Sequence, residues 1–330
     1  MNKTVKKILK ITAFVGAVAG TMHVINLYID KATKILDKLK AKEDNYYKWN
    51  LGNIYYEKTG KGSPLLLIHD FTPYASSYEW TNIVNTLSEN HTVYTIDLLG
   101  GGRSDKPAID YTNFMYVQVI TDFINDVIDE KTDIITSGYS SSIAIMATNY
   151  TSDKIGKLLL INPADIKVMT SKPSICAKAA KKVLEIPVLG TFAYNMFTLR
   201  GNIDLILTEK YLYNPFNVND DMIDSYHNAA HFNGKTNGKY VLASIIGNYM
   251  GANIPYALNN CENDIYIIGG KEQERIEEII EEYKEQKSEI TSIILDKTKK
   301  LPHYENANTT LKEIEKYLST LPDTENEINS

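Results

Sequence analysis

The sequence predicts an α/β protein in which helices cover both faces of a mainly parallel sheet. The first observation is a short, wholly apolar run at residues 65–68, which is typical of a buried parallel strand. The second is the repeated alternation of strand patterns with segments of helical length and periodicity. The third is composition, because 43% apolar and 23% charged residues give a chain of 330 residues a sizeable core.

The elements follow in order along the chain. Residues 46–58 are predicted to form a β-hairpin that turns near Gly52 and Asn53, because two alternating aromatic and aliphatic segments meet there. Further strands are expected at residues 65–68, 92–97, 133–137, 157–161, 265–268 and 289–295. Helices are expected at residues 78–90, 115–130, 141–150, 273–286 and 308–318.

The alternation stops in one long segment, residues 167–258, which is mostly helical in pattern. A helical segment between two halves of a sheet suggests a lid over a site. The expected organisation is a membrane anchor at residues 1–30, a linker at 31–45, a core at 46–166 and 259–320, a lid at 167–258 and a tail at 321–330.

The N-terminal segment differs from the rest of the chain. Lysines 3, 6, 7 and 10 precede residues 11–29, which contain no charged side chain and are about long enough to cross a bilayer. A cleaved signal peptide, with Ala17-Val18-Ala19 as the small-residue pattern, and a packing helix are the alternatives. Apolar residues continue to Ile29, which favours an uncleaved single-pass anchor in the cell membrane. Lysines on both flanks leave the orientation open, with an extracytoplasmic catalytic domain favoured.

Several classes of function are disfavoured. A net charge of −6 argues against nucleic acid as a partner. Cys176 and Cys261 stand alone, so no Cys-rich zinc site or disulfide framework is expected. His227 and His231 have the spacing of metal ligands on a helix but lack a third ligand, so we expect them to pack in the lid or to lie at its surface. No metal and no cofactor are predicted, and the oligomeric state is open.

The strongest motif is Gly138-Tyr139-Ser140-Ser141-Ser142, between a predicted strand and a predicted helix. In a G-x-S-x-G elbow, a sharp turn projects the serine hydroxyl over the edge of the sheet. Small neighbours are needed because strand and helix crowd that turn. Ser142 stands at the second glycine position and is small enough for it.

Two further blocks support this motif. His69-Asp70-Phe71-Thr72 follows the first buried strand, and Asp97-Leu98-Leu99-Gly100-Gly101-Gly102-Arg103-Ser104-Asp105-Lys106-Pro107 follows the next. With the elbow, they resemble the HGF and DLxGxGxSxxP blocks of the α/β-hydrolase superfamily, in its lid-bearing branch of esterases and related enzymes. The resemblance covers residues 46–318. It implies Ser140 as nucleophile and the N–H groups of Phe71 and Ser141 as oxyanion donors.

The chain departs from the family pattern at two positions. Asp70 stands where the family has glycine, and Lys300 stands at the catalytic-histidine position of the stretch Lys299-Lys300-Leu301-Pro302-His303-Tyr304-Glu305. Lysine acts as a base only when its pKa falls towards neutrality. His303, three residues on, is the alternative base if the loop is shifted.

The acid of the triad is also open, and for it the resemblance suggests Glu272, then Glu274, with Asp165 one strand earlier. The leading hypothesis is a membrane-anchored serine hydrolase that acts on a small ester or related acyl substrate through Ser140. The rival is a non-catalytic pseudo-hydrolase that binds a ligand or a protein partner.

Overall fold

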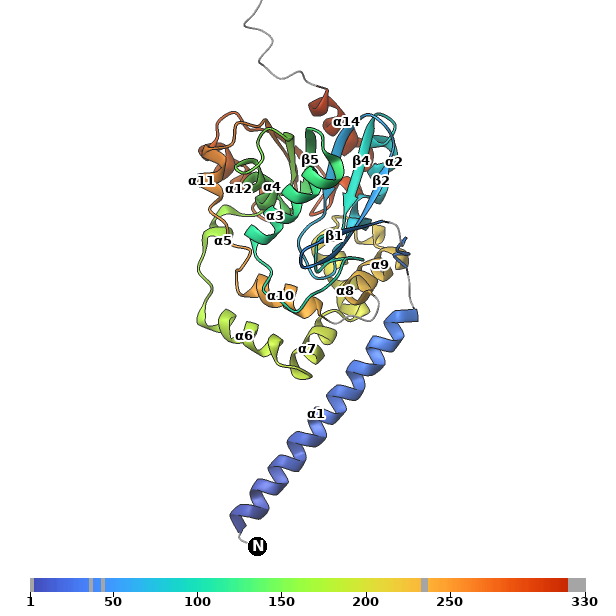
Figure 1. Cartoon of the computed structure of the whole chain (residues 1–330), viewed down its shortest axis with the longest axis vertical. Helices are drawn as coiled ribbons and strands as arrows, with labels where there is room; N and C mark the ends of the chain where they lie inside the picture. The colour runs from blue at the N-terminus through green and yellow to red at the C-terminus, as the bar shows by residue number, and fades with distance from the viewer. Residues whose placement is uncertain (1–2, 36–37, 43–44, 233–236, 320–330) are drawn as a thin grey trace, which may run out of the picture.

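The sheet has eight strands in the order β1-β2-β4-β3-β5-β6-β7-β8. The computed structural model describes residues 3–35, 38–42, 45–232 and 237–319 (Figure 1). The strands are β1 (Tyr46–Trp49), β2 (Gly52–Thr59), β3 (Ser63–Ile68), β4 (His91–Ile96), β5 (Thr132–Ser137), β6 (Ile155–Ile161), β7 (Ile265–Gly270) and β8 (Thr291–Leu295).

Strands β3 to β8 pair in parallel, whereas β1 and β2 form an antiparallel edge. The predicted mainly parallel α/β architecture is therefore confirmed. The β1–β2 hairpin pairs Trp49 with Gly52, so its turn lies at residues 50 and 51, just before the predicted position. In a parallel sheet the carboxyl ends of the strands share one edge, and the loops after β3, β5, β6 and β7 meet there.

Helices cover both faces of the sheet, and alternate residues of the strands face opposite layers. Leu66 of β3 belongs to the core beneath α3 (Asn113–Phe123), α4 (Ser140–Thr148) and α12 (Ile276–Gln286). Leu67 belongs to the core beneath α2 (Thr81–Leu87) and α14 (Ala307–Leu318). Burying each such side chain stabilises the fold by about 1.5–3 kcal/mol, so the two cores hold the strand ends in register.

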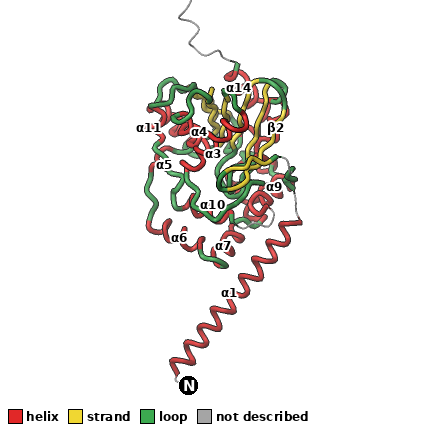
Figure 2. Tube along the Cα trace, in the orientation of Figure 1, coloured by secondary structure: helices red, strands yellow, loops and turns green. Residues whose placement is uncertain are grey.

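The segment between β6 and β7 is helical, as the sequence predicts, and is called here the helical insertion. Figure 2 shows its middle helices below the sheet, whereas its first and last helices lie to the side, near α4. Tyr194, Leu207 and Tyr226 of the insertion form an apolar core with Tyr74 and Leu301, which belong to loops after β3 and β8. Its members are α5 (Ile166–Thr170), α6 (Ile175–Glu185), α7 (Leu189–Phe197), α8 (Arg200–Ile206), η3 (Leu207–Tyr211), η4 (Pro215–Asn217), α9 (Asp220–His231), α10 (Gly238–Ile246) and α11 (Ile254–Asn259).

A single helix, α1 (Lys3–Ile35), precedes the sheet and projects from the body of the molecule (Figure 1). By length and composition it is able to cross a membrane, and its most apolar stretch is exposed. The helix runs on to Ile35, inside the predicted linker. Residues 36–37 and 43–44 of that linker, and the predicted tail 321–330, lie outside the described residues.

Candidate active site

The turn between β5 and α4 is centred on Gly138. Its φ is +57°, in the left-handed region that favours glycine, whereas Ser140 has no positive φ. The Gly138 N–H donates to the Ile161 carbonyl and so ties the turn to β6. A Cβ atom at Gly138 would lie 2.2 Å from Asp70 Oδ1. The left-handed residue of the elbow is thus a glycine, two positions before the predicted serine.

Ser140 lies in the first turn of α4 and is fully buried. Its Oγ donates to the His69 carbonyl at 2.5 Å, towards the interior. The hydroxyls of Ser141 and Ser142 also face inward and donate to the carbonyls of Gly138 and Tyr139. The elbow motif predicts that the Ser140 hydroxyl projects from the edge of the sheet. In the structure that hydroxyl faces inward, and the positive φ of the turn falls at Gly138.

The carboxylate of Asp70 fills the space above the elbow. Its Oδ1 accepts the Tyr139 N–H at 2.8 Å, and its Oδ2 lies 2.7 Å from Lys300 Nζ. In hydrolase elbows the N–H of the residue after the left-handed position helps to hold the oxyanion. Because Tyr139 follows Gly138, a carboxylate oxygen of the protein itself occupies that donor.

Lys300 comes to this point from the loop after β8. Burial alone would lower its pKa, but the adjacent Asp70 carboxylate outweighs this, and the pKa of Lys300 is raised above its usual value. Its Nζ also lies 4.7 Å from the centre of the Tyr211 ring, and the Asn162 amide donates to its carbonyl. Lys300 is therefore a charged partner of Asp70, and a charged ammonium has no lone pair with which to act as a base.

His303 belongs to α13 (Pro302–Glu305), on the other side of this loop. It is fully buried and stacks on Trp80, with ring centres 4.3 Å apart. Neither ring nitrogen has a hydrogen-bond partner among the described residues. Burial lowers the pKa of His303 to about 3, so the ring is neutral at pH 7. The structure does not bring His303 to Ser140.

Sequence reasoning missed Glu79, which is buried beneath the ion pair. Its Oε1 accepts the Asp70 N–H at 3.2 Å and lies 3.9 Å from His303 Nε2. Burial, together with the neighbouring Asp70 charge, raises the pKa of Glu79 well above its usual range. Glu79 thus lies directly beside the ion pair of Asp70 and Lys300. A glutamate in the first turn after a predicted loop gave no signal of this role.

The candidate acids and the candidate oxyanion donor Phe71 lie outside the Asp70–Lys300 ion pair. Asp165 caps α5 by accepting the Lys167 N–H at 2.8 Å, and it also pairs with Arg275. Glu272 is exposed, with no side-chain partner given by the described residues. Phe71 is buried with its ring centre 4.7 Å from that of Tyr116.

The Ser141 N–H donates to the Gly138 carbonyl at 3.2 Å. It is therefore occupied within the turn, whereas Phe71, the other predicted donor, lies next to Asp70.

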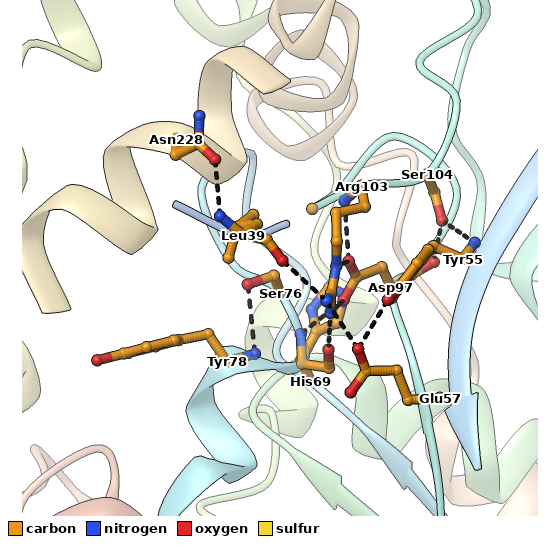
Figure 3. A network of polar contacts seen from close by, with 12 residues as sticks. Leu39, Tyr55, Glu57, His69, Ser76, Tyr78, Asp97, Arg103, Ser104 and Asn228 are labelled. Carbon is orange, nitrogen blue, oxygen red and sulfur yellow. Dashed lines mark hydrogen bonds and ion pairs between the residues drawn. The ribbon is translucent and has the colours of Figure 1, made fainter. Parts of the chain in front are cut away.

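A second buried network fixes the loop that carries Asp70 (Figure 3). His69 Nε2 accepts the Leu98 N–H at 2.9 Å, so Nδ1 has the proton and donates to the Asp70 carbonyl at 2.7 Å. Next to it, Arg103 Nε lies 2.7 Å from Asp97 Oδ2. Burial opposes ionisation of Asp97, but Arg103 outweighs it and holds the pKa of that carboxyl below its usual range. The DLxGxGxS block is therefore a rigid support of the site.

A cavity of about 380 Å³ remains at the carboxyl edge of the sheet. Charged and polar residues contribute to its wall, and they are Tyr139, Asn162, Asp165, Gln273, Glu274, Arg275 and Lys300. The described residues contain no group of three or more His, Cys, Asp or Glu side chains placed to hold a metal ion. His231 instead bonds to Thr198 Oγ1 at 2.8 Å within the helical insertion.

Comparisons with known proteins point to one fold. The model of the alpha/beta hydrolase fold family matches residues 63–186. A 2-hydroxy-6-oxo-6-(2'-aminophenyl)hexa-2,4-dienoic acid hydrolase from Metapseudomonas resinovorans is 28% identical over 144 residues, 42% of this chain and 49% of that protein. A soluble epoxide hydrolase from Corynebacterium sp. (strain C12) is 28% identical over 122 residues, 36% of this chain and 42% of that protein. The chain thus spans about half the length of these curated relatives or less.

Solved structures extend the likeness over most of the chain. A meta-cleavage product hydrolase from Pseudomonas fluorescens IP01 superposes with a TM-score of 0.63 at 16% identity, covering 84% of this chain and 98% of that one. A membrane phospholipase A described as a bacterial virulence factor superposes with a TM-score of 0.66 at 16% identity, covering 96% and 97%. The chain therefore has the α/β-hydrolase fold, and its relatives support its place in the superfamily of that name.

Proposed function

We propose that this chain is a membrane-anchored, non-hydrolytic member of the α/β-hydrolase superfamily that binds a ligand or a partner. The observation that supports this most is the position of the Asp70 carboxylate between the Tyr139 N–H and Lys300. It occupies both the space of an elbow side chain and the donor that an oxyanion would need.

Electrostatics opposes acyl transfer at such a centre. An oxyanion about 4 Å from a carboxylate would be destabilised by about 4 kcal/mol at an effective dielectric constant of 20. That energy corresponds to roughly a thousandfold loss of rate. Lys300 offsets part of this repulsion, but it is already held by Asp70 and has its pKa raised. A general base next to Ser140 is missing among the described contacts, since that hydroxyl donates to a carbonyl.

The alternative is the serine hydrolase that the sequence predicts, with a small ester as substrate. The relatives favour it, since they are hydrolases. It would require Ser140 to leave the His69 carbonyl and become exposed, and a base to reach it from Lys300 or His303. Each of these groups is held elsewhere by the contacts described above, so the geometry favours the non-hydrolytic function.

The cavity of about 380 Å³ would take a small ligand with both polar and apolar parts, because Val168 and Ile279 line it beside the charged residues. Lys300 and Arg275 contribute positive charge to its wall, and Asp165 and Glu274 contribute negative charge. In open α/β sheets, ligands bind at the carboxyl ends of the strands, where this cavity lies. The helical insertion, whose apolar core also contains Tyr74 and Leu301 from the loops of the site, would act as the lid of this site.

Helix α1 would anchor the protein as a single membrane pass. Its charge-free residues 11–29 and its preceding lysines support this, while a signal sequence has the same composition. Mass spectrometry of the mature chain would decide between the two, because cleavage after Ala19 would remove residues 1–19 with all four lysines that precede the charge-free stretch.

The test of the non-hydrolytic function is active-site labelling of the full-length chain with a fluorophosphonate probe. We expect no labelling of the folded protein. The variant Gly138→Ser/Asp70→Gly/Lys300→His, which restores the family residues around the elbow, should gain labelling and shows that the probe reaches the site. Labelling of the unmodified chain that disappears in Ser140→Ala would overturn the proposal in favour of the serine hydrolase.

A further inference from the structure

We propose that the α6–α7 edge of the helical insertion is a second membrane-contacting surface, which lies in the headgroup layer of an anionic bilayer beside α1. This inference rests on the proposed role of α1 as a membrane anchor. It adds that the globular part contacts the bilayer directly, through one defined face, and is not linked to the membrane by α1 alone.

The depth at which α1 meets the insertion supports this surface. Residues 4–21 of α1 are exposed, and packing against the body begins at Met22. The exposed part of the charge-free stretch, residues 11–21, is 11 residues long, or about 16 Å at 1.5 Å per residue. That is about half of the ~30 Å hydrocarbon core. A full crossing therefore includes residues of α1 that already contact the helical insertion.

The contact itself is specific. Asn26 of α1 is buried, its amide donates to the Val188 carbonyl at 3.0 Å, and its Oδ1 accepts from the Asn195 amide at 2.9 Å. Asn26 lies inside the charge-free stretch, three residues before its end at Ile29. Val188, which immediately precedes α7, is therefore held at the depth where the stretch leaves the membrane.

An exposed apolar stripe on α6 lies at that level. Ile175, Ala179, Val183 and Ile186 follow one another at spacings of four, four and three residues, which places them on one face of α6 and its end. All four are exposed, and Ile175 is 87% exposed. Leu189 continues the stripe at the start of α7. An apolar face beside a polar one is typical of helices that lie in a membrane interface.

Positive charge lies beside this stripe. Lys178 and Lys182 are exposed beside the apolar stripe, with no ion pair to another described residue. With Lys181 and Tyr249 they line a groove of about 520 Å³, while Lys181 itself is paired with Asp110 and Glu185. Basic residues on the polar side of an interfacial helix favour anionic lipid headgroups.

Leu39, in the described segment 38–42 beyond α1, is bonded to two parts of the body. The Leu39 N–H donates to the Asn228 side chain of α9 at 3.2 Å, and the Leu39 carbonyl accepts from Arg103 Nη1 at 3.3 Å (Figure 3). The chain that leaves α1 is thus bonded to both the insertion and the core. A bilayer that holds α1 therefore meets the same side of the body each time.

The experiment uses the native cysteine of α6. Cys176 is exposed and Cys261 is buried, so an environment-sensitive thiol dye labels Cys176 in the folded full-length chain. The protein is reconstituted in phosphatidylcholine vesicles with or without phosphatidylserine, and quenching by lipids with brominated acyl chains is measured. The matched control is Cys176→Ser/Glu285→Cys, which moves the dye to an exposed position on α12.

We expect several-fold stronger quenching of the dye at Cys176 than at the control position, and more with phosphatidylserine. The exposed variants Val183→Ser/Ile186→Ser and Lys178→Glu/Lys182→Glu should lose this difference while the protein still sediments with the vesicles. Sedimentation with equal quenching at both positions would overturn the second surface but leave the anchor intact. Failure to sediment would overturn the anchor, and the inference with it.

Discussion

Asp70 and Lys300 form an ion pair in which Oδ2 and Nζ are 2.7 Å apart. Both residues stand at positions where the sequence departs from the α/β-hydrolase pattern, and they meet at the centre of the site. The Asp70 side chain is fully buried, and that of Lys300 is 22% exposed. Asp70 without Lys300, or Lys300 without Asp70, would be an unpaired charge in the interior. Each residue therefore offsets the cost of burying the charge of the other.

Replacing Lys300 alone should be strongly destabilising. Lys300→Met keeps the aliphatic stem but leaves the Asp70 charge buried without its partner, and we expect a loss of about 3–5 kcal/mol in the free energy of unfolding. In Asp70→Asn/Lys300→Met most of this loss should be recovered, because no charge remains. Chemical unfolding followed by circular dichroism measures both variants.

The control for this cycle is Lys154→Met, which removes the exposed pair with Asp129. Exposed pairs contribute less than about 1 kcal/mol. A loss in Lys300→Met as small as that of the control would mean that Asp70 is not dependent on Lys300.

Gly138 should tolerate no side chain while Asp70 is present. In Gly138→Ala the new Cβ meets Asp70 Oδ1, and the positive φ alone costs about 1–2 kcal/mol. We expect a clear fall in melting temperature. Gly201→Ala, in α8, is the matched control because nothing lies within 4 Å of its Cβ, and it should be neutral or slightly stabilising. Equal melting temperatures for the two variants would show that Gly138 is not the crowded residue of the elbow.

Local patterns predicted most of the fold. The buried strands and periodic helices follow from side-chain spacing. The DLxGxGxS block indicates the family in the sequence, but the ion pair of Asp97 and Arg103 within it is seen only in the structure. The motif predicts the right turn but places its central residue at Ser140, two positions after Gly138. Serines at positions 140–142 are small, so they fit the pattern of small residues whether the turn is centred on residue 138 or 140. The signal that favours Gly138 is conformational, since glycine is the residue that takes a positive φ without strain.

The charge arrangement of the site could not be read from the sequence. Asp70 and Lys300 were each noted as departures, but their contact joins loops after β3 and β8, and one sequence does not reveal contacts between distant segments. Glu79 was missed for the same reason, because its raised pKa depends on burial beside Asp70. Helical periodicity gives no information on which loop will cover such a residue.

The stability of the protein should depend on pH through His303. Its pKa is about 3 in the folded state, below the usual 6.5, so the folded state binds fewer protons than the unfolded state between those values. The contribution of His303 is thus present above pH 6.5 and is lost as pH falls towards 3, at up to about 1.4 kcal/mol per pH unit. His303→Phe keeps a ring on Trp80 and should remove this part of the slope.

The measurement is the free energy of unfolding of both proteins at several pH values between 4 and 7. As pH falls, the free energy of unfolding should decrease more for the unmodified protein than for His303→Phe. Any advantage in stability that the unmodified protein has at pH 7 should therefore shrink or reverse. Parallel curves would mean that His303 is exposed to protonation in the folded state, as a catalytic base would be.

Arg103 should resist even a conservative change, because its guanidinium bonds in several directions at once. Nε contacts Asp97, Nη2 donates to Ser77 Oγ at 2.5 Å, and Nη1 donates to the Leu39 carbonyl. A lysine offers a single point of charge and cannot reproduce this geometry. We expect Arg103→Lys to lose about 2 kcal/mol or more of stability, because Asp97 is fully buried.

The same change should loosen the segment that joins α1 to the body. Without the bond to the Leu39 carbonyl, trypsin should cleave after Lys38, Lys40 or Lys42 faster than in the unmodified chain, which gel electrophoresis of timed digests measures. Arg200→Lys is the control, because Arg200 is 43% exposed and pairs with Asp220 and Asp224 at the surface. If both variants were cleaved at the unmodified rate, Arg103 would not hold this segment, and the orientation of the body relative to α1 would have to come from Asn26 and Asn228 alone.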